Sequence, residues 1–359
     1  MSIPRTAAAV LCLIALSAIA QAAEATEPQP LPPVLPAPIA SRFAPVVYLA
    51  KGEHWRPDSA ADFLAHSSLV LDRPDASTAT NSTSFTRREG SCANTVLESP
   101  VAAEGVSLAR ASVDPEIAAI RNGVLSCTPI AGAVSHRVSK TRRSSTALVL
   151  RSDGTVAHGE PTAATPALAD VPVYTVYVPH RFIAYWFFYP YNGFEHKYVP
   201  VLAPVVELHQ GDWEHIVVDL RAPAVAGGED ESTAVEYFQH GCAAKVYPAS
   251  FSALGSLTSP GRAFGVQEGT HPVVYSALGG HASYPNAGER LGADCGLFAG
   301  RGDVTSRGAR WATAGDVTDA TRQPWWGFTG NWGTGGKHGG VFDISPLVGP
   351  VSPSPLRER

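Results

Sequence analysis

Residues 173–189 read VYTVYVPHRFIAYWFFY, and this stretch decides the expected fold. It contains two runs of β-branched and aromatic residues, Val173–Val178 and Phe182–Tyr189, separated by a short segment that starts with Pro179. Residues of these types favour strands, and a proline between two such runs is typical of a turn. We therefore expect two neighbouring strands here, the second ending before Pro190.

The same pattern continues on both sides of this stretch. Similar runs occur at Phe43–Leu49, Glu214–Leu220, Thr233–Gln239 and Pro272–Leu278, and Gly or Pro separates most of them. A short helix is expected at Ser59–Ala65, capped by the preceding aspartate. Several short strands divided by turn residues predict an all-β domain with short helices, arranged as an antiparallel β-sandwich or a barrel. The sandwich is the preferred prediction.

Composition supports a loop-rich β protein. The 359 residues include 33 Gly and 30 Pro, 45% are hydrophobic and 16% are charged. So many Gly and Pro residues exclude a bundle of long helices, and the apolar content excludes a disordered chain. The net charge of −5 offers no general attraction to nucleic acid, and the sequence contains no glycine-rich phosphate loop, so no nucleic acid or nucleotide partner is expected.

The N-terminus has the features of a secretory signal. Arg5 precedes an apolar run, Ala7–Ala20, and Ala20-Gln21-Ala22 provides the small residues of a cleavage site. The protein is therefore predicted to be secreted or periplasmic. The expected organisation is a signal peptide (1–22), a Pro-rich leader (23–40), one β-sandwich domain (41–350) with a loop-rich insertion of open shape (about 75–168), and a flexible tail (351–359).

The cysteines agree with export. Cys12 lies in the signal segment, which leaves Cys92, Cys127, Cys242 and Cys295. An even number in an oxidising compartment predicts two disulfides, although three pairings are possible and free buried thiols are the alternative. The preferred pairs are Cys92–Cys127 and Cys242–Cys295, because each closes a loop of moderate length.

The densest polar segment is His209–Leu220, with the sequence HQGDWEHIVVDL. On a strand, Asp212 and Glu214 fall on the same face as the apolar residues that follow at alternate positions. Two carboxylates at the end of an apolar face are costly unless a cation compensates them. A divalent cation would do so, with calcium or magnesium preferred by oxygen ligands. A turn at Gly211 could add His209 and favour manganese or zinc. Alternatively, the carboxylates lie in solvent and pair with Arg or Lys.

Two further segments are candidates for a ligand site. Gly279–Pro285 (GGHASYP) follows an apolar strand and presents His281 and Tyr284 from a loop, although a lone loop histidine is often merely a surface residue. Trp325–Gly333 (WWGFTGNWG) provides aromatic rings separated by glycines. These rings, Trp326 among them, could form a stacking platform or close the end of the sandwich by packing, and packing is preferred.

Several of these segments, taken in order, resemble a known family, the vacuolar protein sorting-associated "VPS sixty-two"-related proteins. The resemblance covers Phe43–Val70 and Val171–Ser345 and omits the insertion. The family's name implies trafficking, which does not transfer to an exported protein. The motifs that carry the resemblance are YWFFYPYN (Tyr185–Asn192), GDWEH (Gly211–His215), HPVVY (His271–Tyr275), GHA (Gly280–Ala282) and NWG (Asn331–Gly333).

The block around the carboxylates is also similar to the necrosis- and ethylene-inducing-like proteins, which are secreted β-sandwich cytolysins. Their G-H-R-H-D-W-E segment is associated with a divalent metal that docks on sphingolipid headgroups. This resemblance implies His209, Asp212 and Glu214 as metal ligands, with Asn192 in place of the upstream aspartate. Here Gly211 replaces the second histidine of that segment and Asn192 is neutral, which lowers the expected affinity for a cation.

These observations favour a secreted, divalent-cation-dependent binding or membrane-active protein. The cation would contact a lipid headgroup or a glycan, with His215, His281, Tyr284 and Trp326 as candidate ligand-binding residues. The alternative is a metal-assisted hydrolase in which His215 or His281 acts as general acid or base. A third possibility is a purely structural role for the acidic pair. A non-enzymatic function is preferred.

Overall fold

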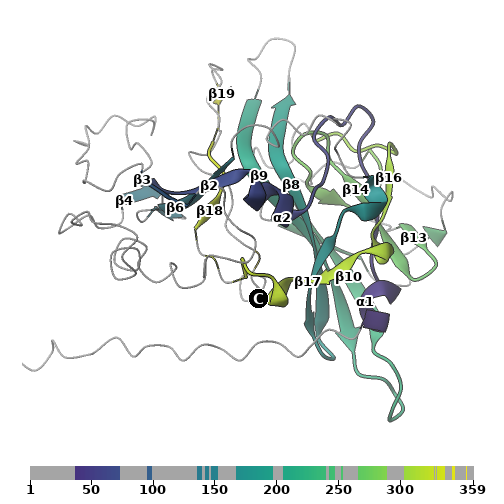
Figure 1. Cartoon of the computed structure of the whole chain (residues 1–359). Helices are drawn as coiled ribbons and strands as arrows, with labels where there is room; N and C mark the ends of the chain where they lie inside the picture. Colours follow the sequence, from purple (N-terminus) through teal and green to yellow (C-terminus); the bar gives the residue numbers. More distant parts are fainter. Residues whose placement is uncertain are drawn as a thin grey trace, which may run out of the picture. The chain divides into compact units, whose positions relative to one another are not determined.

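The computed structural model describes part of the chain (Figure 1). The described residues are 37–72, 95–98, 136–139, 142–144, 147–152, 167–196, 205–239, 242–246, 252–253, 266–288, 303–326, 328, 330–335, 342–343 and 353. The predicted signal peptide, Cys92, Cys127 and Cys295 lie outside them, and the side chain of Cys242 is not described. Export and the disulfide pairing therefore stay predictions.

The prediction of an all-β fold with short helices is confirmed. The larger sheet of the described residues has the strand order β11-β10-β9-β8-β7-β17, with β19 also paired to β9. β8 and β9 are its longest strands, with 15 and 17 residues. The bounds are β7 (Val173–Val178), β8 (Phe182–His196), β9 (Val205–Arg221), β10 (Glu231–Gln239), β11 (Cys242–Val246), β17 (Val317–Asp319) and β19 (Phe342–Asp343).

The smaller sheet has the order β12-β13-β14-β1-β16, with β15 also paired to β14. Most neighbours in sequence pair antiparallel, as predicted, but β12 pairs parallel with its neighbour β13, and β1 with β14, β17 with β7, and β19 with β9 also pair parallel, so the sheets are mixed. The other three parallel pairs join strands that lie far apart in the chain, so no turn signal in the sequence predicts them. The bounds are β1 (Val46–Tyr48), β12 (Ser252–Ala253), β13 (Val266–Glu268), β14 (His271–Ser276), β15 (Ser283–Tyr284) and β16 (Arg310–Ala312).

The two sheets pack face to face as a sandwich. One buried cluster joins residues of the larger sheet, such as Phe187 and Ile216, to Val47, Val274 and Trp311 of the smaller sheet. Residues at the alternate positions of β8 and β9 form a second cluster on the outer face. Successive side chains of β8 and β9 thus point to opposite faces of the sheet, and both faces are covered.

A third sheet of four strands, β18-β6-β2-β3, contributes to the outer cluster through Leu69, Leu150 and Trp332. Three of its strands are β2 (Ser67–Asp72), β3 (Thr95–Glu98) and β6 (Ala147–Ser152), and β18 (Asn331–Trp332) completes it. β4 (His136–Ser139) and β5 (Arg142–Ser144) form a hairpin. β3, β4, β5 and β6 fall in the predicted insertion, whose described part is therefore also β structure.

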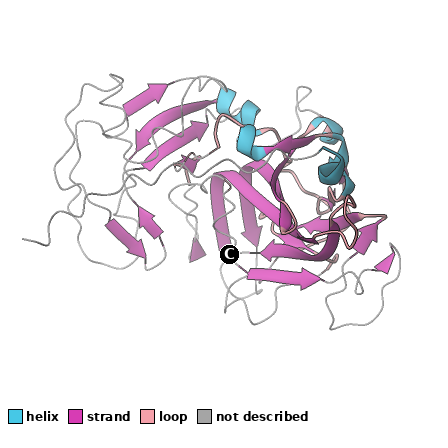
Figure 2. Cartoon of the chain, turned by 90° about the horizontal axis from the view of Figure 1, so that it is seen from below, coloured by secondary structure: helices cyan, strands magenta, loops and turns pink. Residues whose placement is uncertain are grey.

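Helices are few and short (Figure 2). They are α1 (Ala37–Arg42), α2 (Ala60–Ala65), η3 (Leu168–Asp170), η6 (Thr313–Gly315) and η7 (Ala320–Arg322). α1 begins within the predicted Pro-rich leader, and Ile39 and Ala40 are buried in the core. None of the helices among the described residues has the length and apolar character needed to span a membrane.

Two local predictions are wrong. Pro190 does not end its strand, because β7 pairs with β8 only as far as Trp186 and leaves a free edge where a residue without an N–H is tolerated. The cap of α2 is Ser59, whose side chain accepts a hydrogen bond from the Asp62 N–H, whereas Asp58 accepts one from the Ser59 N–H. The helix therefore starts at Ala60, one position later than predicted.

Candidate functional site

Asp212 and Glu214 point into the sandwich at one end of β9, as the alternation predicts. The register of β8 on β9 places Tyr189 opposite Asp212 and Phe187 opposite Glu214, and both aromatic residues belong to the cluster between the sheets. The side chain of Asp212 is 8% exposed. Two acidic side chains therefore enter the apolar interior together, about 7 Å apart along the strand.

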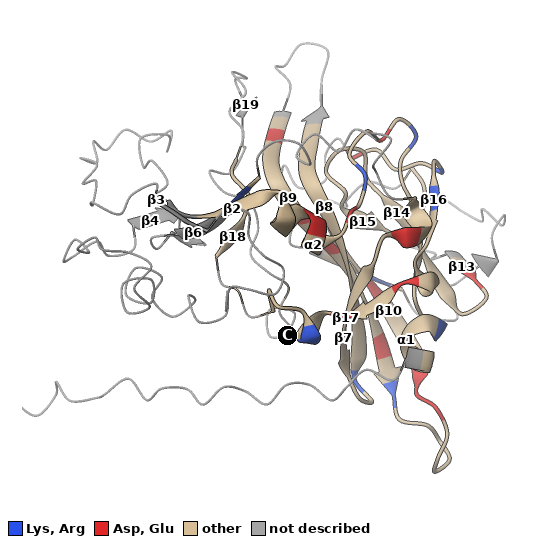
Figure 3. Cartoon of the chain, in the orientation of Figure 1, with Lys and Arg blue, Asp and Glu red and all other residues tan. Residues whose placement is uncertain are grey.

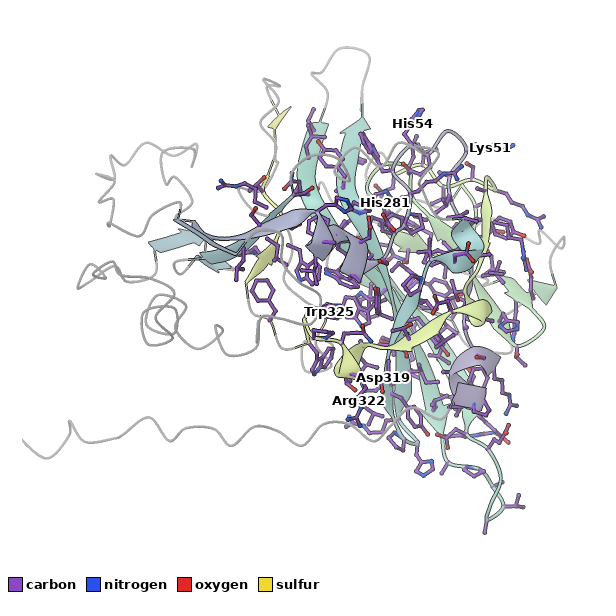
Figure 4. The ribbon with its side chains drawn as sticks, in the orientation of Figure 1. Lys51, His54, His281, Asp319, Arg322 and Trp325 are labelled. Carbon is purple, nitrogen blue, oxygen red and sulfur yellow. The ribbon has the colours of Figure 1, made fainter. Side chains whose placement is uncertain are left out.

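His281 supplies a positive charge to this end of the sandwich. Its Nδ1 lies 2.9 Å from Asp212 Oδ2 and its Nε2 lies 3.8 Å from Glu53 Oε2, with the imidazole 0% exposed. The ring of Tyr189 stacks on it at a centroid distance of 3.8 Å and an interplanar angle of 4°. Figure 4 shows His281 inside the fold. Its backbone φ of 55° lies in the left-handed region, in the turn that follows Gly279 and Gly280.

Glu53 is a site residue that sequence reasoning missed. It lies in the loop after β1, where its Oε2 accepts a hydrogen bond from the Gly279 N–H (2.6 Å) and its Oε1 one from the Trp55 N–H (2.8 Å). Its side chain is 2% exposed. Nothing in the sequence distinguishes Glu53 from a solvent-exposed loop carboxylate, because its burial depends on the distant turn that carries His281.

The two carboxylates stabilise the charged form of His281. Burial opposes the charge of His281, but its interactions with Asp212 and Glu53 prevail and raise its pKa to about 9. Burial would likewise raise the pKa of Glu53, but His281 and the two backbone N–H groups hold it below its ordinary value. The protonated imidazole of His281 therefore compensates the negative charge of Asp212.

Glu214 has no such compensation. Burial, followed by the charges of Asp212, Asp303 and Glu207, raises the pKa of Glu214 well above its ordinary value. No described residue donates a hydrogen bond to its carboxyl group, and the residue keeps partial solvent access. Asp212 also keeps one oxygen free, because His281 Nδ1 and Asn192 Nδ2 (3.4 Å) both contact its Oδ2.

His209 does not reach the carboxylates, so the prediction of a turn at Gly211 is wrong. Gly211 lies within β9 with φ of 63°, and the imidazole Nδ1 of His209 lies 3.0 Å from the Gly211 carbonyl oxygen. A Cβ at Gly211 would lie 2.5 Å from the carbonyl oxygen of Trp332. The glycine is therefore needed for the close approach of two backbones, and a histidine would not fit here.

The predicted metal ligands are therefore only partly brought together. Among the residues that the structure describes, no group of three or more His, Cys, Asp and Glu side chains is placed to hold one ion. Asn192 accepts the Phe194 N–H on Oδ1 (3.1 Å) and presents its amide nitrogen, which cannot bind a cation, to Asp212. The donors that fit a hard cation are the free oxygen of Asp212 and the carboxyl group of Glu214.

The remaining candidate residues lie elsewhere or have structural partners. His215 stacks between Trp186 (4.0 Å) and Phe238 (4.1 Å) on the other face of β9. Tyr284 is buried and donates a hydrogen bond to Asp303 Oδ2 (2.6 Å). Trp326 is partly buried against the outer cluster.

Packing explains the other tryptophans of the Trp325–Gly333 segment. Trp325 is 1% exposed and Trp332 is 0% exposed, and both belong to the outer cluster. The preference for packing over a stacking platform is therefore confirmed for these two rings.

Part of the chain matches a known protein family. Residues 179–334 match the family described as "Vacuolar protein sorting-associated protein 62". This segment is similar to the Vps62 family, and we call it the Vps62 segment. The Vps62 segment includes β8, β9, β10, β14 and the turn of His281, so it contains all of the site except Glu53.

Other comparisons add little to the Vps62 match. No curated protein matches the chain. A solved structure titled "Crystal structure of non-toxic HaNLP3 protein" is similar at 18% identity, with a TM-score of 0.20, over 34% of this chain and 48% of that chain. The chain thus spans about half the length of that protein, and a likeness this weak supports no argument about function.

Proposed function

We propose that this protein is a divalent-cation-dependent binding protein whose site is the acidic end of the sandwich. The observation that carries the proposal is the pair of interior carboxylates, Asp212 and Glu214, which face the same way and keep oxygens free of any described partner. When bound, the cation is a hard Lewis acid, and oxygen atoms of a polar ligand can coordinate to it.

The chain's own residues have distinct roles in this proposal. Asp212 and Glu214 would hold the ion, calcium or magnesium by preference for oxygen ligands. His281 and Asn192 fix the second oxygen of Asp212, as outer-shell partners of metal ligands do. Because Asp212 and Glu214 would supply only a few oxygen ligands, the other coordination positions would be left to water and to the ligand, which we propose to be a lipid headgroup or a glycan.

The charge balance favours a cation here. Glu53, Asp212, Glu214 and Asp303 are acidic, and His281 contacts two of them, Glu53 and Asp212. Glu214 therefore holds a proton more tightly than an ordinary carboxyl group. A bound cation would replace that proton, so its affinity is expected to rise with pH.

The hydrolase alternative is less well supported. Both ring nitrogens of His281 face carboxylates and the ring is fully buried, so it is not placed to exchange a proton with a substrate as a general acid or base. His215 lies on the opposite face of β9 from Glu214. We therefore propose a binding protein rather than an enzyme.

Titration calorimetry of the purified protein with calcium, magnesium, manganese and zinc tests the proposal. Wild type should bind at least one ion, and Asp212→Asn and Glu214→Gln should each weaken binding by at least about tenfold, since each removes one of two charged ligands. Glu236→Gln is the matched control, because that carboxylate is paired with Lys245 on the neighbouring strand. Absence of binding, or equal binding by all variants, would refute the proposal.

Export is a separate proposal that rests on the predicted signal segment. N-terminal sequencing of protein recovered from outside the cytoplasm should find a mature end close to residue 23. A mature end at Met1 would contradict it.

A further inference from the structure

Three loops are joined into one surface at the end of the sandwich above the acidic site. We call it the loop tip, and define it as residues 51–56, 278–281 and 303–308. The Lys51 N–H donates to Ser306 Oγ (2.7 Å), the Gly279 N–H donates to Glu53 (2.6 Å), and the Leu278 N–H donates to the Val304 carbonyl (3.0 Å). The loop tip is therefore held in one arrangement before any ligand binds.

Its outward side chains are mainly cationic. Lys51 and Arg307 are exposed and Arg56 is partly exposed, whereas the acid of the same loop, Glu53, is turned inward. No described residue pairs with the charged groups of Lys51 or Arg56. Arg307 lies over the ring of Tyr48 at 4.7 Å, which keeps its guanidinium at the surface. Basic residues gather near β16 in Figure 3, although the whole chain carries a net charge of −5.

Apolar side chains lie among these cations. Val304 is 38% exposed and is one of the two exposed large hydrophobic residues in the described part of the chain. Trp55 and Leu278 are partly exposed, and the indole of Trp55 packs on Tyr191 at 4.6 Å. His54 is exposed beside them, and Figure 4 shows Lys51 and His54 projecting from the same end of the fold.

We propose that the loop tip docks on an anionic lipid bilayer. Cations beside an amphipathic indole and exposed aliphatic groups match the interface of a membrane, where phosphates and hydrocarbon lie within a few ångströms of one another. A nucleic acid or an acidic protein would satisfy the cations but would leave Val304 in water or against polar groups. The inference goes beyond the proposed function, because the contact is made by the side chains of the loop tip and needs no divalent ion.

Co-sedimentation of the full chain with vesicles tests this inference. In the presence of chelator, wild type should bind vesicles of phosphatidylcholine with phosphatidylserine, and should bind pure phosphatidylcholine weakly. Lys51→Glu and Arg56→Glu should each reduce partition by at least about fivefold, the effect of one cation near an anionic surface. Val304→Asp should also reduce it.

Arg181→Glu is the matched control, because this exposed arginine precedes the opposite end of β8 from the loop tip. It makes the same change in net charge and should bind vesicles as wild type does. Equal loss in Arg181→Glu, binding that needs added calcium, or binding to duplex DNA rather than vesicles would each overturn the inference. Because chelator is present, failure here leaves the cation site intact, and failure of the cation site leaves vesicle binding unchanged.

Discussion

Replacing His281 with Gln tests the electrostatic argument most directly. The substitution keeps a polar side chain of similar reach but removes the positive charge that contacts Asp212 and Glu53, whose side chains are 8% and 2% exposed. Removing one partner of a buried ionic group costs about 3–5 kcal/mol, because the remaining charges stay buried without compensation. We expect His281→Gln to lower the free energy of unfolding by this amount at neutral pH.

The pH dependence gives an independent measure of the same effect. The pKa of His281 is raised from 6.5 to about 9, so the folded state binds this proton more tightly than the unfolded state does. Its contribution is therefore complete below pH 6.5 and is lost as the pH rises through about 9. A difference of this size corresponds to about 3 kcal/mol. Wild type should lose this stability over that window, and the variant should not.

Urea denaturation followed by tryptophan fluorescence, repeated across this pH range, measures both effects. His54→Gln is the control, because His54 is exposed in the adjacent loop. Equal unfolding free energies for wild type and His281→Gln, or parallel pH profiles, would show that His281 is not the counter-charge of the site.

Two further stability measurements test other parts of the structure. Burial raises the pKa of Asp58 from 3.8 to about 6, so the charged form of this residue destabilises the folded state at higher pH. Asp58→Asn should therefore raise the free energy of unfolding near pH 8 by up to about 3 kcal/mol, and this gain should vanish below pH 4. An equal effect at both pH values would contradict this. Gly211→Ala should destabilise more than Gly227→Ala: both positions have positive φ, but only at Gly211 would a Cβ meet another backbone. Similar melting temperatures for the two variants would disprove the close-approach argument.

The sequence by itself determined the features that depend on near neighbours. Runs of β-branched and aromatic residues gave β7 and the first part of β8, and the alternation of side chains along β9 placed Asp212 and Glu214 on one interior face. The motifs of the Vps62 segment were also visible as short strings. Each of these signals spans only a few residues, which is why it could be found without the fold.

Only the tertiary structure decided what those carboxylates meet. His281 lies 69 positions from Asp212 in the chain, and Glu53 approaches it from the loop after β1, on the other sheet. The sequence around Gly211 is compatible with a turn, but the residue lies within β9, where the backbone of Trp332 passes close to it. Charge compensation and close backbone contact act through space, so their partners come from segments that sequence spacing does not connect. The alternation along β9 predicts that a positive charge lies near Asp212. The packing of the distant loop that carries His281 decides that this charge is an imidazolium.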